Sequence, residues 1–451
     1  MARHSAHLPE QSLAGGTEDT AAGETPAGAA AGRAGKGLPR VASALRHRNY
    51  RLYWGGQIVS LTGGSMQAIG QAWLVLELTQ SAFQLGVVGA LQFLPVLLFS
   101  VFGGVVADRW PKRRIVFVTQ SAAMLQAFAL WALIATNSIH LWQIYMLALL
   151  LGLTTSLDQP TRSAFVVELV GREDLPNAVA LNSSFTNLTR IVGPALGGFL
   201  IATRGVGDLF LLNGLSFLAM IMALALMRSA ELQAQAQRDT DTGGRQTTWQ
   251  NLREGLAYVR DTPAISLLIV VVGLVLLFGA NHNVVLPLIA TDVLHAGAQG
   301  FGVLSAALGV GSLCAALWLA WSHTRPTIRR VLLGSLAFSV LGAAFALSHS
   351  YALSVALLAL EGAAETIMGA LAITMLQTVA PDPLRGRVTS VYILSFTGSI
   401  PLGYVLAGWL SALVGVSSGL LICMLLCLIV TGVGWRWRTP AEQALAVAAH
   451  G

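Results

Sequence analysis

Long apolar stretches recur along this chain after about residue 50, with short polar segments between them. A helix needs about 20 mostly apolar residues to cross the hydrocarbon core of a bilayer. The pattern predicts twelve such helices, and the polar cluster Ser348–Tyr351 predicts a tight turn between two of them. The predicted spans are residues 52–76, 83–107, 115–136, 141–158, 183–203, 208–228, 265–289, 301–321, 331–348, 352–379, 389–412 and 416–435.

Three hydrophilic segments divide the chain. The segment 1–45 is rich in Ala, Gly, Thr and Glu and predicts a disordered cytoplasmic tail without the apolar core of a signal peptide. The segment 229–264 predicts a cytoplasmic central loop, in which Trp249–Val259 has the pattern of an amphipathic surface helix. Residues 437–451 predict a second cytoplasmic tail. The sequence therefore predicts an N-terminal six-helix bundle over 46–228 and a C-terminal one over 265–436.

Composition and charge placement support a membrane protein. Hydrophobic residues make up 55% of the chain and charged residues only 11%, whereas soluble domains carry about 25% charged residues. The net charge is +6. With a cytoplasmic N-terminus and alternating spans, every one of the 27 Lys and Arg except Arg204 is assigned to the cytoplasmic side. This spread through many short segments argues against nucleic-acid binding and predicts that both termini are cytoplasmic.

The loop after the second span carries a recognisable motif. It reads Gly-Val-Val-Ala-Asp-Arg-Trp-Pro-Lys-Arg-Arg from Gly104 to Arg114 and resembles the G-x-x-x-D-R-x-G-[RK]-[RK] signature of the major facilitator superfamily, with Pro111 in place of the second glycine. The alternative is an ordinary basic loop. The resemblance implies a twelve-helix, all-α membrane protein built as two six-helix pseudo-repeats, and a gate at the cytoplasmic helix ends. The implied gating residues are Gly104, Asp108, Arg109, Lys112 and Arg113.

The fifth predicted span contains a Gly-Pro-x-x-Gly-Gly sequence. It resembles the end of the motif that marks exporters in this superfamily, with Thr189 in place of an earlier motif glycine. Glycines four residues apart also let two membrane helices pack closely, and this packing role is compatible with the first reading. The exporter-type residues are Gly193, Pro194, Gly197 and Gly198.

Three further stretches narrow the resemblance. They are Asn49–Gln57, Asp158–Arg162 together with Asn177–Ser183, and Gln377–Val388. Over roughly residues 46–436 they resemble the branch that includes the enterobactin exporter and macrolide-efflux-type carriers. The arginine typical of the fourth span in proton antiporters is missing from Leu141–Leu157, so any proton coupling must depend on other residues.

Two glutamates in the tenth predicted span are candidates for that coupling. Glu361 and Glu365 are four residues apart and share one face of a helix. A charge at that depth costs a few kcal/mol, so we expect the pair to face a central cavity and not lipid. Two neighbouring carboxyls disfavour a double negative charge, and one of them can then carry a proton near neutral pH. Attraction of a cationic substrate and a purely structural hydrogen bond are the alternatives.

Other polar residues within the spans are candidates for substrate contact, because the first and seventh helices line the cavity in the family that the chain resembles. Helix packing is the alternative for each. His282 is the one among them that titrates near neutral pH. The candidate cavity residues are Gln67, Gln71, Asn187, Arg190, Asn281 and His282.

These observations together predict a secondary active transporter of a bacterial inner membrane, without catalytic residues, metal or cofactor. It would export a small organic molecule, such as a siderophore, a macrolide or another drug, by alternating access coupled to protons. Its partners would be the substrate, protons and the bilayer, and the protein would be a monomer. An uptake carrier and a non-transporting sensor or scaffold of the same fold are the alternatives. The chain contains neither GxxxxGK[ST] nor HExxH, which argues against an ATP-driven pump and a metalloenzyme.

Overall fold

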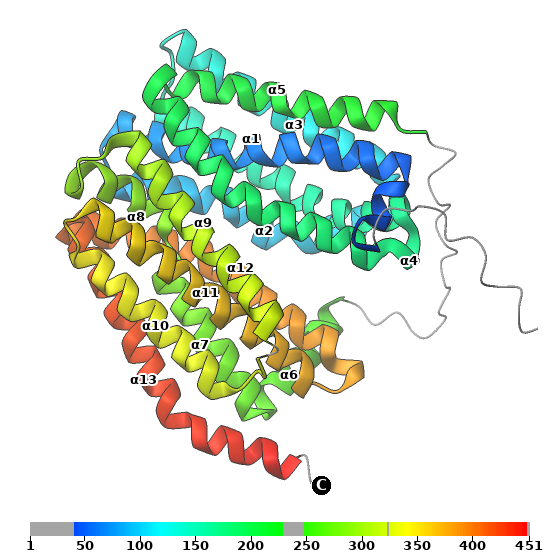
Figure 1. The fold of residues 1–451 in the computed structure, drawn as a ribbon, viewed down its shortest axis with the longest axis vertical. Helices are drawn as coiled ribbons and strands as arrows, with labels where there is room; N and C mark the ends of the chain where they lie inside the picture. Colours follow the sequence, from blue (N-terminus) through cyan, green and yellow to red (C-terminus); the bar gives the residue numbers. More distant parts are fainter. Residues whose placement is uncertain (1–39, 229–247, 323, 449–451) are drawn as a thin grey trace, which may run out of the picture. The chain divides into compact units, whose positions relative to one another are not determined.

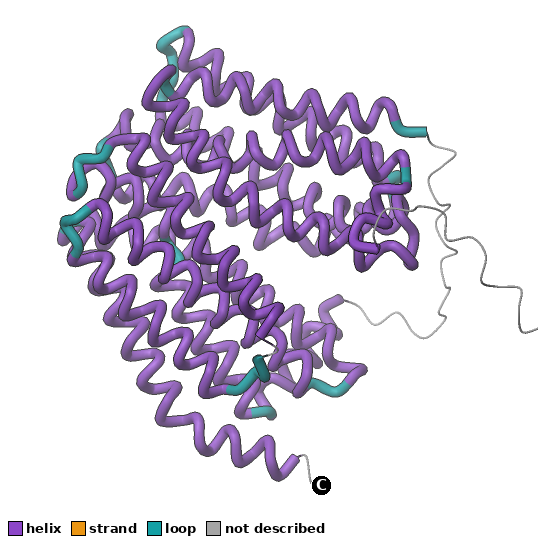
Figure 2. Tube along the Cα trace, viewed as in Figure 1, coloured by secondary structure: helices purple, strands orange, loops and turns teal. Residues whose placement is uncertain are grey.

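The computed structural model describes residues 40–228, 248–322 and 324–448, and it places no β-strand in them (Figure 1, Figure 2). The predicted N-terminal tail lies outside the described residues as far as residue 39, and Arg40–Arg46 forms the short 3-10 helix η1. The α-helices are α1 (Arg48–Thr79), α2 (Ala82–Arg109), α3 (Lys112–Ala135), α4 (Leu141–Arg204), α5 (Val206–Leu226), α6 (Thr248–Asp261), α7 (Pro263–Gly279), α8 (His282–Leu288), α9 (Gly297–Ser322), α10 (Ile328–Leu347), α11 (Tyr351–Val379), α12 (Asp382–Val414) and α13 (Val416–Ala448), and Ile289–Val293 forms the π-helix η3.

The helices account for all the predicted spans. In the described part of the chain, 10 helical segments are long and apolar enough to cross a membrane. One of them is the 64-residue α4, which contains the fourth and fifth predicted spans on either side of a kink at Gly171. The helix α1 covers the first predicted span. The expected turn between the ninth and tenth spans is confirmed at Ser348–Ser350.

The helices extend beyond the predicted spans at two places. The connection between the fourth and fifth spans was expected to be a loop, but it is helical except at Gly171, whose φ of 73° and ψ of 178° interrupt the helix. Glycine adopts this positive φ without steric cost, so one residue is enough to reverse the chain direction. At the other end, the predicted tail after residue 436 continues α13 as a helix to Ala448.

The seventh predicted span is broken near its middle. The helix α7 ends at Gly279, and α8 begins at His282 after the non-helical residues Ala280 and Asn281. The Asn281 side-chain amide donates hydrogen bonds to the carbonyls of Leu277 (3.1 Å) and Phe278 (2.8 Å). These bonds satisfy acceptors that the interrupted helix leaves without partners, which such a break requires within a bilayer.

The helices form two sets that meet along two pairs. The helices α1, α3, α4 and α5 pack on one another, and so do α7, α10, α11 and α13. The helix α2 packs on α4 and belongs to the first set, whereas α9 packs on α11 and α12 packs on α7, so both belong to the second set. The first set contacts the second mainly through α2 against α12 and α4 against α9. The amphipathic helix predicted in the central segment is present as α6, which lies against α12 with Glu254 paired to Arg387.

Glycines allow the two sets to touch at one end. We call the end of the bundle that holds the α1–α2 turn the distal end; the sequence assigns it to the outside. A Cβ on Gly86 of α2 would lie 2.3 Å from the Tyr404 carbonyl of α12, and one on Gly198 of α4 would lie 2.7 Å from the Gly302 Cα of α9. Backbones this close require residues without side chains. Contact between the two sets at the distal end therefore depends on glycine.

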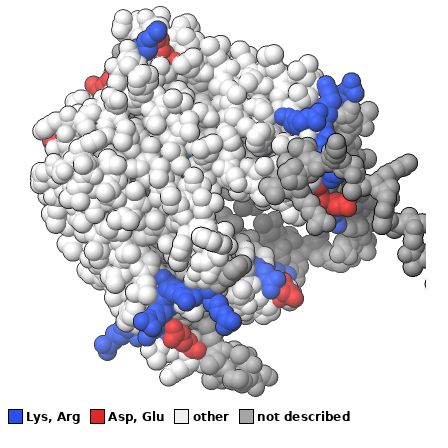
Figure 3. Space-filling view, in the orientation of Figure 1, with Lys and Arg blue, Asp and Glu red and all other residues white. Residues whose placement is uncertain are grey.

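Charged side chains avoid most of the surface. On the face shown in Figure 3, Lys, Arg, Asp and Glu lie at the margins, and a wide uncharged area separates them. Large hydrophobic side chains are exposed on many helices, including Leu317 of α9 (63% exposed), Leu402 of α12 (64%) and Ile429 of α13 (62%). This is the surface expected of helices that face lipid.

The short helix η1 is tied to the kinked region of α4 at the end opposite the distal end. Asp174 lies 2.8 Å from His47 Nε2 and 3.5 Å from an Arg46 guanidinium nitrogen, and it accepts a hydrogen bond from Ser43. The Ala44 amide donates to Asn177 Oδ1 at 3.0 Å. The hydrogen bonds from Ser43 and His47, with the Arg46 charge, lower the pKa of Asp174. The ionised carboxylate thus anchors the start of α1 to α4.

We expect Asp174→Asn to reduce the free energy of unfolding at pH 7 by about 1 kcal/mol, because the neutral amide loses charge-assisted hydrogen bonds. The lowered pKa means that the folded protein binds this proton less readily than the unfolded chain. The carboxylate therefore stabilises the fold above its unfolded pKa of about 3.9 and ceases to do so as the pH falls through the lower folded value. Thermal unfolding of the purified protein at pH 7 measures the difference. The exposed neighbour Glu173 supplies the control Glu173→Gln, and an equal effect of both changes would contradict the prediction.

Candidate functional site

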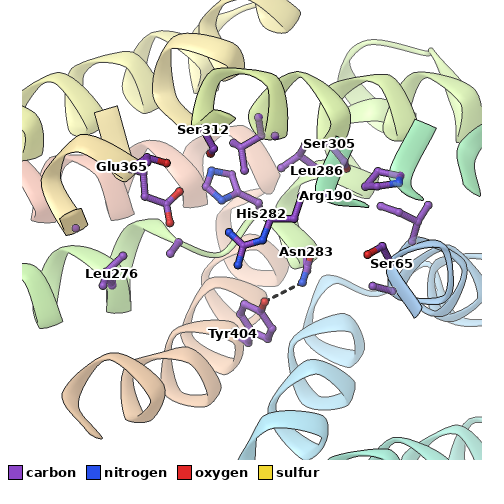
Figure 4. Close-up of a pocket in the computed structure, with 18 of the residues that line it drawn as sticks. Ser65, Arg190, Leu276, His282, Asn283, Leu286, Ser305, Ser312, Glu365 and Tyr404 are labelled. Carbon is purple, nitrogen blue, oxygen red and sulfur yellow. Dashed lines mark hydrogen bonds between the residues drawn. The ribbon is translucent and has the colours of Figure 1, made fainter. Parts of the chain in front are cut away.

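A cavity of about 490 Å³ lies where the two sets of helices face each other (Figure 4). Its charged or titratable lining residues are Arg190 of α4, His282 of α8 and Glu365 of α11. Serine, threonine, tyrosine and asparagine side chains from five helices supply further polar groups. They are Ser65 (α1), Asn283 (α8), Ser305 and Ser312 (α9), Thr366 (α11) and Tyr404 (α12). A cavity of this size with a mixed apolar and polar lining suits a small organic ligand.

The two glutamates of α11 differ in their relation to the cavity. Glu365 lines the cavity, as the sequence predicts, whereas Glu361 is 1% exposed and lies behind the wall. Glu361 Oε1 is 3.2 Å from His282 Nε2, and its second oxygen, Oε2, has no hydrogen-bond partner among the described residues. The expectation that both carboxyls face the cavity was therefore wrong for Glu361. One helical turn separates a carboxyl open to the cavity from a buried one, and His282 connects the buried carboxyl with the cavity.

The break between α7 and α8 determines where the His282 side chain lies. Because α8 restarts at this residue, the imidazole reaches both the cavity and Glu361. The ring packs edge-on against Phe338 of α10, with ring centroids 6.5 Å apart. A side chain that holds a buried carboxyl on one side and borders an open cavity on the other can pass protons between them.

Arg190 reaches the cavity from the opposite set of helices. Its backbone is held close to α9, because a Cβ on Gly309 would lie 2.8 Å from the Arg190 carbonyl oxygen. The side chain is exposed to the cavity and forms no hydrogen bond or ion pair with any residue that the structure describes. The charge count of the sequence assigned Arg190 to the cytoplasmic side; that side and its role as a candidate cavity residue stay predictions.

The other candidate cavity residues lie elsewhere. Gln67 is buried inside the first set, where it donates to Gln126 Oε1 at 2.9 Å and accepts from Asn213. Gln71 donates to Gln92 at 3.4 Å and borders a smaller cavity of about 90 Å³. Asn281 caps the end of α7 as described above. Asn187, on α4, is half-buried and does not line the main cavity. Gln67 and Gln71 both also border a third cavity of about 50 Å³, whereas Asn281 lines none of these three cavities.

The motif between α2 and α3 is partly fixed by contacts within the first set. Lys112 forms an ion pair with Glu168 of α4 at 2.7 Å, and the Arg113 guanidinium donates to the Leu224 carbonyl of α5 at 2.9 Å. Arg109 is exposed, and the side chain of Asp108 lies outside the described residues. A Cβ on Gly104 would meet no atom of the described residues within 4 Å, so the close helix contact expected of this glycine is not made among them in this conformation.

The exporter-type motif faces two helices, α1 and α9, and the cavity. A Cβ on Gly193 would lie 2.3 Å from the side chain of Ser65 on α1. The carbonyl of Pro194 is close to Gly302 of α9, and Pro194 also lines the cavity. Gly197 faces α1 of the same set, with its nearest atoms at 3.4 Å, while Gly198 faces α9 of the other set. The motif therefore packs within one set and between the two sets at once.

A buried arginine on α4 was not among the sequence candidates. Arg162 is paired with Asp158, which also accepts hydrogen bonds from Thr119 (2.6 Å) and Gln120 (3.2 Å) of α3. The sequence placed Arg162 in a loop after the fourth span. Because α4 continues through this region, the arginine lies in the helix, and its partner Asp158 links it to α3.

The comparisons with known proteins agree with this architecture. The chain matches, over residues 41–450, a family described as transmembrane secretion effectors. A staphyloferrin A transporter of Staphylococcus aureus is 24% identical over 368 residues, covering 79% of this chain and 88% of the transporter. An enterobactin exporter of Escherichia coli is 27% identical over 410 residues, covering 89% of this chain and 96% of the exporter. A crystal structure of a bacterial homologue of the human lysosomal transporter Spinster, inward-facing and occupied, gives a TM-score of 0.68 at 12% identity, covering 88% of this chain and 97% of the homologue.

Proposed function

We propose that this chain, which belongs to the transmembrane secretion effector family of major facilitator transporters, exports a small organic molecule in exchange for protons. The family and the helical fold make it a multi-pass membrane protein and a secondary transporter. The observation that carries the coupling proposal is the cavity between the two sets of helices, in which Glu365 is open to solvent while His282 connects to the buried Glu361.

Proton coupling requires a group that takes up and releases a proton on the two sides of the membrane. Glu365 meets this requirement because it lines the cavity and forms no hydrogen bond or ion pair with any described residue that would fix its charge. The Glu361–His282 pair lies one turn away on the same helix and can share the proton. Two carboxyls within one site disfavour a second negative charge, whereas a protonated imidazole favours it, so proton occupancy depends on what else the cavity holds.

Alternating access supplies the transport step. Contact between the sets at the distal end, through Gly86 against Tyr404 and Gly198 against Gly302, closes one side of the cavity in this conformation. We propose that this is the outer side, that both termini are cytoplasmic, and that the loop Gly104–Arg113 closes the other side when the cavity opens outward. Under this proposal the units that move are the bundles 46–228 and 265–436, in a monomer within a bacterial inner membrane.

The relatives indicate where to look for the substrate. Their names refer to enterobactin and staphyloferrin A, so we propose a siderophore first and a macrolide or another drug second. Inverted membrane vesicles that contain the protein should accumulate labelled enterobactin, staphyloferrin A or erythromycin when their interior is acidified. A protonophore should remove the accumulation. Accumulation that persists with the protonophore would contradict proton coupling, and uptake in the reverse direction only would contradict export.

A further inference from the structure

Two opposite charges line the cavity, one on each set of helices. Arg190 extends from α4 and Glu365 from α11, and both border the same space, as Figure 4 shows. Neither side chain has a hydrogen bond or an ion pair with any residue in the part of the chain that the structure describes. The other titratable groups at this site, His282 and Glu361, are paired with each other. The cavity therefore presents a guanidinium and a carboxyl that attract each other across it, but no hydrogen bond or ion pair joins them in this conformation.

Charges at this depth are costly unless water or an opposite charge compensates them. In the open cavity, water can do so. When the cavity closes around its cargo that water is displaced. A cargo that lies between the two residues also prevents them from pairing with each other, so each charge then needs a partner on the cargo. A cargo with a single charge would satisfy only one of the two residues. A cargo that carries both an anionic group and an ammonium group satisfies both, and it connects α4 with α11 across the cavity.

We propose that the cargo is a zwitterion whose anionic group binds Arg190 and whose ammonium group binds Glu365. This inference rests on the export function proposed above and narrows its substrate class to siderophores or drugs that carry both an anionic group and a free amine. It also gives the exchange of cargo for protons a physical basis. The ammonium group binds only the ionised carboxylate, so a proton on Glu365 must leave to the cytoplasmic water before the cargo can bind. Cargo and proton then exclude each other at one residue, as an antiporter requires.

The remaining lining residues fit such a cargo. Hydroxyl groups of Ser65, Ser305, Ser312 and Thr366 also line the cavity, and Figure 4 shows Ser312 on the side of Glu365. Tyr404 accepts a hydrogen bond from the Asn283 side chain at 2.9 Å, which fixes its hydroxyl at the cavity wall. These groups can bind the oxygen and nitrogen atoms of a polar molecule without adding charge. The volume of about 490 Å³ admits a molecule larger than a single amino acid.

Three probes with one skeleton test the charge requirement. They are the dipeptide of two phenylalanines, its C-terminal amide and its N-acetyl derivative, which are a zwitterion, a cation and an anion. Binding is measured by calorimetry on the purified protein in lipid nanodiscs without any gradient. We expect the zwitterion to bind at least about tenfold more tightly than either analogue, because it makes one more charge-assisted contact.

Two variants identify the residues. In Arg190→Gln the zwitterion should bind no better than the amide, whose affinity stays unchanged. In Glu365→Gln it should bind no better than the N-acetyl dipeptide, and the release of a proton on binding, followed with a pH dye, should disappear. The exposed Arg172 supplies the control Arg172→Gln, which should leave all three affinities unchanged.

Equal affinities for the three probes, tighter binding of either singly charged probe, or no binding by any of them would overturn the proposal. These outcomes are separate from a failure of the export function. Selective binding of the zwitterion by a protein that shows no proton-driven transport would support the charge assignment and contradict only the coupling. Proton-driven transport of enterobactin by a protein that shows no preference for the zwitterionic probe would support the export function and contradict the charge assignment.

Discussion

Replacement of Glu365 by glutamine should abolish proton-driven export while the protein still reaches the membrane. Glutamine has nearly the same shape and can donate and accept hydrogen bonds, so the packing of α11 should not change. It cannot bind and release a proton, however, and Glu365 is the carboxyl that lines the cavity. We expect accumulation in acidified inverted vesicles to fall to the background of vesicles without the protein.

A second measurement separates coupling from damage to the protein. If Glu365 carries the coupling proton, Glu365→Gln should retain exchange of labelled for unlabelled cargo across the membrane, because this exchange needs no proton movement. Affinity would be lower if the residue also binds the cargo. Glu77, an exposed carboxyl at the end of α1 that accepts a hydrogen bond from Trp73, supplies the control Glu77→Gln. Normal proton-driven export by Glu365→Gln would eliminate the coupling role.

The helical spans were predictable because their signal lies in local composition. An apolar stretch of membrane-spanning length, flanked by basic residues, predicts a helix without knowledge of its neighbours. The motif at Gly104–Arg114 then indicated the family, and the family match over residues 41–450 confirms it. The joining of the fourth and fifth spans was missed because their connection contains several polar residues and only one glycine, Gly171, that breaks the helix.

The cavity was predictable only in part. Sequence spacing placed Glu361 and Glu365 on one face of a helix, but it could not show that a single turn separates the cavity wall from the buried interior. The rotation of α11 against α10 and α9 decides this, and that rotation results from packing over the whole bundle. The hydroxyls of Ser305 and Ser312 were missed for the same reason, because serine is common at helix contacts in membranes. The role of Gln67 stays a prediction, because a buried amide network looks the same in sequence as a ligand site.

The two adjacent glycines of the exporter-type motif provide the second large effect. We expect Gly198→Ala to impair transport severely and Gly197→Ala to have little effect. A Cβ at Gly198 would lie 2.6 Å from the Ala298 carbonyl oxygen and 2.7 Å from the Gly302 Cα, both backbone atoms of α9 that cannot rotate away. At Gly197 the nearest atoms lie at 3.4 Å, which is ordinary contact. Overpacking of this kind costs about 2 kcal/mol, enough to change the balance between two conformations by a factor of about 30.

The direction of the change follows from the place of the contact. Gly198 touches the other set of helices at the distal end, so the added methyl group opposes closure there and favours the conformation open at that end. Spin labels at the exposed positions Thr203 and His295, near the distal ends of α4 and α9, should move apart in Gly198→Ala and stay in place in Gly197→Ala. If both alanine variants transport equally well, the glycine contact does not limit the cycle. If both fail with unchanged label distances, the motif serves packing within the first set and not closure between the two.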